Sequence, residues 1–152
     1  NLLQNCIREV KEIAYNLLPP ELEKGFLNAI ERFAHRISSI GQIQFIIDIE
    51  DEIQEDDLNH MDKFNLYRII QELFNNSLKH AKATEFTIRV KKHNGGILIM
   101  AMDNGIGFQI NEVQKGLGIE NIQYRMNMAG IEGRFESSKN KGTSVTMQLR
   151  SN

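Results

Sequence analysis

The chain has 152 residues, 41% of them hydrophobic and 25% charged, which is the balance of a soluble globular domain rather than a disordered segment. Its net charge of −2 shows no basic excess of the kind that marks nucleic-acid binding, and its single cysteine, Cys6, excludes an internal disulfide. No apolar run approaches the roughly 20 residues that span a bilayer. Because the chain begins at Asn1 rather than at a methionine, we expect a fragment whose missing part decides any membrane attachment.

The N-terminal part of the chain predicts two helices. Apolar residues recur at three- and four-residue steps over residues 3–17, which is typical of an amphipathic helix. The double proline at 19–20 ends this helix, because proline lacks the backbone donor and restricts the residue before it. A second helix is predicted over residues 21–38. We expect residues 1–40 to be a helical segment distinct from a domain over residues 41–152.

The remaining chain alternates between strand and helix patterns. The predicted order is strand 42–50, helix 62–81, strands 85–92 and 96–103, helix 119–129, and strands 133–137 and 143–150. We interpret the acidic run 50–57 as a solvated loop and helix start. Asn94-Gly95-Gly96 favours a hairpin, because asparagine and glycine tolerate positive φ. Neighbouring strands joined by hairpins predict a mixed, mostly antiparallel sheet with helices on one face.

A polar cluster lies on the long helix predicted over 62–81. At about 100° per residue, Glu72, Asn76, Lys79 and His80 fall on one flank of its apolar stripe, which by itself is the pattern of a wet helix face. Glu72 and Asn76 are one turn apart, however, so both can reach one bound group. Asparagine is also a poor helix former, and its amide oxygen suits Mg²⁺. On this helix alone the solvated-face interpretation remains open, and these two details weigh against it in favour of a magnesium site.

A carboxylate and bare backbone follow the predicted strand 96–103. Asp103 ends an apolar run, and two glycine pairs come after it: Gly105 with Gly107, and Gly116 with Gly118. Glycines allow close backbone approach, and the second pair leads into a helix whose N-terminus can hold phosphate. Neither pair fits a P-loop or a dinucleotide fingerprint. Each pair alone is open to a plain turn interpretation, but together with Glu72 and Asn76 they predict a nucleotide pocket.

These segments resemble the conserved boxes of sensor histidine kinases. Residues 72–81 resemble the N box and residues 103–108 the first glycine box. Residues 116–119, followed by Arg125, resemble the second glycine box, and Gly142-Thr143 the last. Their order fits the kinase branch of the gyrase–chaperone–kinase–MutL ATPase superfamily. The ending Asn-Ser-Leu-Lys-His-Ala and the short loop between the glycine boxes resemble the subgroup paired with helix-turn-helix response regulators.

The resemblance implies a fold and a role for each site residue. The fold would be α+β, a two-layer α/β sandwich of the Bergerat type, preceded by a partial helical stalk ending near residues 14–22. Asn76 would coordinate Mg²⁺, with the Glu72 carboxylate orienting water or polarising the reacting groups. Asp103 would accept a hydrogen bond from the adenine amino group of ATP. The other residues at the nucleotide would be Lys79, His80, Gly105, Gly107, Gly116, Leu117, Gly118 and Thr143.

The implied activity is transfer of the ATP γ-phosphoryl group to a histidine on a dimerisation helix, for relay to an aspartate of a response regulator. The regulator would be DNA-binding, while no direct nucleic-acid binding is expected of this chain. The full-length protein would be a homodimer. The domain would be cytoplasmic, with any membrane anchor upstream.

The family's phosphoacceptor motif is missing from the chain. The four histidines stand in other contexts: His35, His60, His80 and His93. We therefore do not expect the chain to phosphorylate itself. Two alternatives remain open: a serine kinase or ATPase of the same fold, of the anti-sigma-factor type, and a non-enzymatic nucleotide-binding interaction module.

Overall fold

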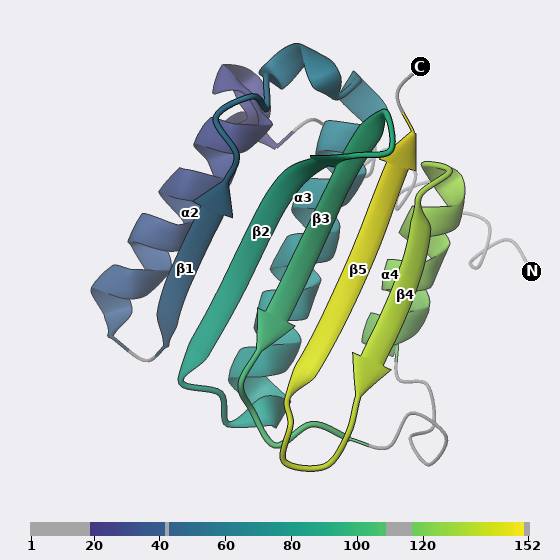
Figure 1. Cartoon of the computed structure of the whole chain (residues 1–152). Coiled ribbons are helices and arrows are strands. Elements are labelled where there is room, and N and C mark those ends of the chain that lie inside the picture. The colour runs from purple at the N-terminus through teal and green to yellow at the C-terminus, as the bar shows by residue number, and fades with distance from the viewer. Residues whose placement is uncertain (1–18, 42, 109–116, 151–152) are drawn as a thin grey trace, which may run out of the picture.

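The structure is a computed structural model that describes residues 19–41, 43–108 and 117–150 (Figure 1). The helix predicted over 3–17 lies outside these residues. The described elements begin with a 3-10 helix, Pro20–Lys24, followed by α2 (Phe26–Ile40), β1 (Gln44–Ile49) and a short 3-10 turn, Glu55–Asp57. Then come α3 (His60–Asn76), a π-helical turn (Ser77–Ala81), β2 (Glu85–His93), β3 (Gly96–Asp103), α4 (Leu117–Met128), β4 (Glu132–Ser137) and β5 (Thr143–Arg150). Among the residues described, no helix has the length and apolar character needed to span a bilayer.

The five strands form one sheet in the order β1-β2-β3-β5-β4. β1 and β2 pair in parallel, because α3 lies between them in sequence and carries the chain back across the sheet. All other neighbours are antiparallel. The helices α2, α3 and α4 lie together on one face of the sheet (Figure 1). The predicted α+β fold, a two-layer sandwich with a mixed and mostly antiparallel sheet, is confirmed.

A cluster of aromatic rings joins the helix layer to the sheet. The Phe74 ring of α3 lies 5.4 Å from the Phe33 ring of α2 and 5.5 Å from the Phe86 ring of β2, in edge-to-face contacts. Phe45 of β1 completes the cluster, with its ring 5.2 Å from that of Phe86. Such pairs add to the hydrophobic gain of burial. The described part of the predicted 1–40 unit thus packs into the common core, and the division at residue 40 stays a prediction.

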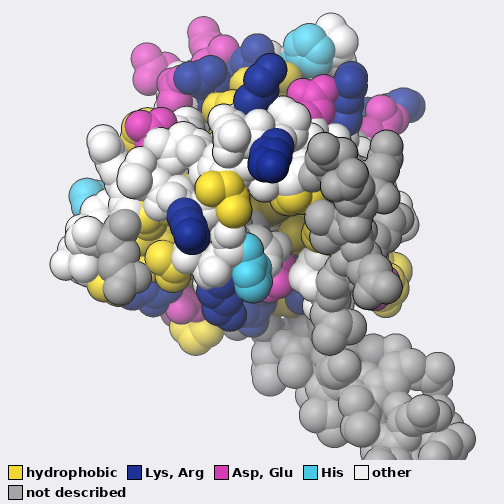
Figure 2. Space-filling view, turned by 90° about the horizontal axis from the view of Figure 1, so that it is seen from below, with side chains coloured by type: hydrophobic (Ala, Val, Ile, Leu, Met, Phe, Trp, Pro, Cys, Tyr) yellow, Lys and Arg dark blue, Asp and Glu magenta, His cyan; other side chains and the backbone are white. Residues whose placement is uncertain are grey.

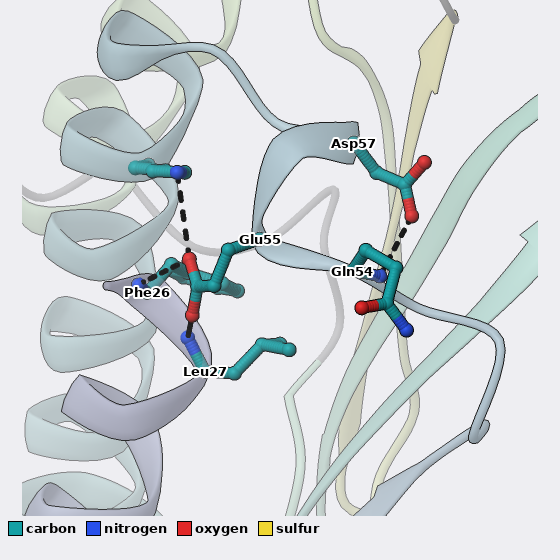
Figure 3. Close-up of polar contacts among 6 residues, drawn as sticks. Phe26, Leu27, Gln54, Glu55 and Asp57 are labelled. Carbon is teal, nitrogen blue, oxygen red and sulfur yellow. Dashed lines mark hydrogen bonds and ion pairs between the residues drawn. The ribbon is translucent and has the colours of Figure 1, made fainter. Parts of the chain in front are cut away.

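The second helix differs from its prediction over 21–38. A 3-10 helix ends at Lys24, Gly25 turns the chain with φ 98°, and α2 begins at Phe26. The cause is a distant carboxylate (Figure 3): Glu55 accepts hydrogen bonds from the backbone N–H groups of Phe26 (2.8 Å) and Leu27 (2.6 Å). An acidic group satisfies the free donors at a helix N-terminus and interacts favourably with the helix dipole. Local sequence could not supply this cap.

Three carboxylates of the acidic run, those of Glu50, Glu55 and Asp57, have specific partners, so the solvated-loop interpretation of residues 50–57 is too simple. The ammonium group of Lys63 on α3 lies 3.4 Å from the Glu55 carboxylate. Asp57 accepts a hydrogen bond from the Gln54 N–H (2.8 Å, Figure 3) and forms an ion pair with Lys92 of β2. The hydrogen bonds from Lys92 and from the Gln54 backbone lower the pKa of Asp57 from its ordinary value.

The Glu55→Ala variant is expected to lower the free energy of unfolding by about 1–2 kcal/mol, because it removes the cap of α2. Urea denaturation followed by circular dichroism measures this loss. Glu52→Ala is the matched control, since Glu52 is an exposed carboxylate of the same segment. Equal stability of the two variants would contradict the capping role of Glu55.

Candidate functional site

A cavity of about 550 Å³ lies between the C-terminal half of α3, the inner face of the sheet and the start of α4. Its walls are largely apolar, from Phe86, Ala101, Ile122, Phe135 and Val145. Its polar groups gather at the end of α3 and at the facing ends of β3 and β5. Figure 2 views the molecule from this end, where a histidine and some Lys or Arg side chains lie near a hollow. A cavity with apolar walls and a few converging polar groups is the usual form of a small-molecule site.

The structure brings most of the predicted site residues to this cavity. Those that line it are Glu72, Asn76, Lys79, His80, Asp103, Gly107, Gly118 and Thr143. Gly105 is not in the lining, and Gly116 lies outside the described residues. Leu117 is the first residue of α4 and is not in the lining. Residues as far apart in sequence as Glu72 and Thr143 thus line one cavity. The prediction that they share one binding site requires this.

Asp103 is the last residue of β3 and pairs in register with Thr143, the first residue of β5. One carboxylate oxygen, Oδ1, accepts hydrogen bonds from the N–H groups of Gly105 (2.8 Å) and Thr143 (3.3 Å). The other oxygen, Oδ2, accepts one from the Ser77 hydroxyl (2.9 Å). A carboxylate has about four lone-pair positions. The three protein donors therefore fix its orientation and leave it able to accept one hydrogen bond from a ligand.

Glu72 and Asn76 form the second polar end of the cavity. They stand one turn apart on α3 and meet the start of α4 at Gly118. A Cβ atom at Gly118 would lie 2.7 Å from Glu72 Oε1 and 3.3 Å from the Asn76 amide oxygen. These atoms are at the ends of flexible side chains, which can shift, so the close approach favours a small residue here without requiring glycine. Gly118 therefore lies beside the Glu72–Asn76 pair, while its predicted contact with the triphosphate stays a prediction.

The chemistry of this pair fits a magnesium ion that also binds phosphate. Mg²⁺ typically takes one or two protein oxygens and keeps phosphate oxygens and waters for its other positions. Glu72 and Asn76 offer one carboxylate and one amide oxygen. The described residues contain no group of three His, Cys, Asp or Glu side chains able to hold a metal by themselves. A metal here would depend on oxygens from its ligand.

Contacts within the protein explain why Gly105 and Gly107 are glycines. A side chain at Gly105 would clash with the Ala81 carbonyl, which accepts a hydrogen bond from the Ile106 N–H (2.7 Å). Gly107 has φ 59°, and a side chain there would clash with the Ser138 carbonyl of the turn between β4 and β5. Close packing of backbone segments thus explains both glycines. Their predicted passage past a nucleotide stays a prediction.

The end of the long helix differs from the continuous helix predicted to Ala81. After Asn76 the chain forms a π-helical turn, Ser77–Ala81, and Lys82 follows in the left-handed conformation with φ 51°. π-turns inside helices occur frequently at functional sites. Lys79 and His80 belong to this turn and line the cavity. The turn ends where the Ala81 carbonyl bonds Ile106, so a contact between distant segments accompanies the change of helix type.

Sequence reasoning missed Ser77, which lines the cavity and bonds Asp103. A signal was present: Ser77 comes four residues after Leu73 and four before Ala81, so it occupies a position of the apolar stripe. A hydroxyl at a buried stripe position needs a partner. The apolar cavity wall was also missed, because strand alternation marks inward residues without showing which of them face a cavity.

Comparison with known proteins agrees with this geometry. Residues 61–152 match the family model described as histidine kinase-, DNA gyrase B-, and HSP90-like ATPase. The sensor histidine kinase MctS of Rhizobium johnstonii is 30% identical over 97% of this chain and 32% of its own length. The sensor histidine kinase YhcY of Bacillus subtilis is 29% identical over 98% of this chain and 38% of its own. The chain thus spans about a third of the length of these two relatives.

Solved structures share the fold at low sequence identity. The histidine kinase domain of the Erythrobacter litoralis blue-light activated kinase superposes with a TM-score of 0.67 at 17% identity, over 82% of this chain and 64% of that one. The ATP-binding domain of PrrB from Mycobacterium tuberculosis superposes with a TM-score of 0.61 at 19% identity. The match covers 81% of this chain and 91% of that one. The chain belongs to the histidine kinase-, DNA gyrase B- and HSP90-like ATPase family and is an ATP-binding catalytic domain of the histidine kinase kind.

Proposed function

We propose that the chain binds ATP with Mg²⁺ in this cavity and transfers the γ-phosphoryl group to a histidine on a dimerisation helix of the full-length protein. One observation carries the proposal. A single cavity has an oriented carboxylate, Asp103, at one end and the Glu72–Asn76 pair at another, with apolar walls between them. This arrangement suits a ligand with a flat, polar-edged base and a metal-binding phosphate tail. The family match and the kinase relatives support the choice of ATP.

Each residue has a defined task in the proposal. Asp103 accepts a hydrogen bond from the adenine amino group, and Phe86, Ile122 and the other apolar wall residues enclose the base and exclude water. Thr143 supports Asp103 through its backbone N–H. Asn76, with Glu72 beside it, holds the metal, which supplies charge neutralisation at the phosphates when bound.

The phosphate tail is assigned to the helix ends. Lys79 and His80, on the π-turn, contribute donors and positive charge. Leu117 and Gly118 offer backbone amides at the start of α4, where a helix N-terminus favours an anion. Gly116, which lies outside the described residues, stays a predicted member of this group. Gly105 and Gly107 shape the loop after Asp103. Because phosphoryl transfer needs mainly positioning and charge stabilisation, these groups suffice for the domain's share of the reaction.

The partners in the proposal follow from the relatives. A response regulator receives the phosphoryl group on an aspartate. The resemblance of the N box to one subgroup favours a DNA-binding helix-turn-helix regulator. The full-length protein acts as a homodimer through its dimerisation helices. The domain works in the cytoplasm, where ATP is available, with any membrane anchor in other parts of the protein.

Phosphoryl transfer to a separate acceptor tests the proposal. The chain is mixed with γ-labelled Mg-ATP and a second protein that carries the dimerisation helix with its histidine. Acid-labile label on the acceptor is expected. Asn76→Ala should reduce the rate by about 10- to 100-fold or more, because it removes a metal ligand. Asn127→Ala, at an exposed position of α4, is the matched control and should keep the rate.

Other outcomes would reject the assignment. Acid-stable label would indicate a serine kinase of the same fold. ATP binding without any label on the acceptor would indicate an interaction module that only binds nucleotide. An unchanged rate in Asn76→Ala would remove the proposed metal position while leaving kinase activity in place.

A further inference from the structure

Ser77 connects the two polar ends of the cavity. It follows Asn76 directly, opens the π-turn, and is only 2% exposed. Its hydroxyl oxygen lies 2.9 Å from Asp103 Oδ2 and 3.0 Å from the Leu73 carbonyl oxygen. Ser77 and Asp103 are 26 residues apart in sequence. The contact therefore ties the helix that carries Asn76 to the strand end that carries the base-binding carboxylate.

The hydroxyl is shared between two acceptors. A serine hydroxyl has one hydrogen, and here both the Leu73 carbonyl and the Asp103 carboxylate lie within hydrogen-bond distance. On Asp103, Oδ1 already accepts two backbone N–H groups. Among the described residues, Ser77 is the side chain that donates to Oδ2. It thereby sets the direction of the oxygen that is left to accept a ligand donor.

We propose that Ser77 is a positioning residue that makes the site select a purine with a 6-amino group. It does so by holding the Asp103 carboxylate in one orientation. A 6-amino group donates a hydrogen bond to Oδ2, whereas a 6-oxo group presents lone pairs to the same negative oxygen. With its orientation fixed, the carboxylate cannot turn away from the 6-oxo group. The inference rests on the proposed ATP-binding function and extends it to base selection.

If Ser77 served only to bond the carbonyl of its own helix, a different result would be expected. Serine hydroxyls inside helices often bond the carbonyl four residues earlier, as Ser77 does with Leu73. If that bond were the whole role, loss of the hydroxyl would change stability or weaken all nucleotides alike. The ratio of the affinities for a 6-amino and a 6-oxo purine nucleotide separates the two roles.

The test compares the affinities of the chain for ATP and for inosine triphosphate, which has a 6-oxo group, by calorimetry with Mg²⁺ present. The wild-type chain should prefer ATP. Ser77→Ala should reduce the ATP-to-ITP affinity ratio about fivefold, the factor that one ordinary hydrogen bond is worth. Ser39→Ala is the matched control: it removes another helical serine hydroxyl, bonded to the Arg36 carbonyl (2.7 Å) on α2. It should keep the wild-type ratio.

A second pair of variants guards against misfolding. Ser77→Thr and Ser77→Val have nearly the same shape, so any crowding is common to both, and they differ in the hydroxyl. The threonine variant should keep the higher ATP-to-ITP ratio. An unchanged ratio in Ser77→Ala, or equal ratios in this pair, overturns the role of Ser77 while ATP binding stands. A wild-type chain that binds neither nucleotide would instead overturn the proposed function itself.

Discussion

Replacing Asp103 by asparagine is expected to lower the ATP affinity about 100-fold, or roughly 2–3 kcal/mol, while the domain stays folded. The asparagine oxygen can still accept the N–H groups of Gly105 and Thr143. Its NH₂ group then faces Ser77, whose hydroxyl accepts that hydrogen and keeps its own bond to the Leu73 carbonyl. The adenine amino group, however, meets a donor where it had an acceptor. The variant should therefore lose affinity for the adenine base without losing the stability of the fold.

Calorimetric titration with Mg-ATP measures the affinity, and urea denaturation confirms the fold. Asp48→Asn is the matched control, since it neutralises a carboxylate of β1 that bonds Arg89 (2.7 Å) outside the cavity. Asp103→Ala provides a contrast, because it leaves two backbone N–H groups without their acceptor and should also cost about 1–3 kcal/mol of stability for each. Near-wild-type ATP affinity of Asp103→Asn would refute the assignment of Asp103 to the base.

The Phe74→Ala variant is expected to show the largest loss of stability, about 3–5 kcal/mol. Phe74 is 1% exposed and its ring contacts three others: Phe33 of α2, Phe45 of β1 and Phe86 of β2. Truncation opens a void where the helix layer meets the sheet, and rigid neighbours fill it only in part. Since domains are typically stable by about 5–15 kcal/mol, this single change consumes much of the total.

The loss is measured as a shift of the urea midpoint at constant slope. Tyr124→Ala serves as the control, because Tyr124 is an aromatic residue on α4 that is 54% exposed, and its truncation should cost less than about 0.5 kcal/mol. The loss of stability in Phe74→Leu should lie between those of Phe74→Ala and Tyr124→Ala, since leucine keeps most of the buried volume. A Phe74→Ala variant as stable as Tyr124→Ala would show that the aromatic cluster does not hold the layers together.

The sequence predicted much of the site because helical and strand periodicities are local properties. The one-turn spacing of Glu72 and Asn76 follows from helix geometry. The opposition of Asp103 and Thr143 joins β3 and β5, which α4 and β4 separate in the sequence, and only the resemblance implied it. The contact of Gly118 with the Glu72–Asn76 pair joins two distant segments, and the structure alone showed it. Of these features, the one-turn spacing alone needed no knowledge of how distant segments pack.

By itself, the sequence predicted the two-layer α+β architecture and the family, both confirmed, and the residues that we propose bind Mg-ATP. Only the tertiary structure showed that Glu55 caps α2 across 29 residues, and that the long helix ends in a π-turn against Ile106. It alone showed that the Ser77 hydroxyl donates a hydrogen bond to Asp103. The physical reason is the same in each case: a hydrogen bond between distant segments satisfies backbone or buried groups that local periodicity leaves open.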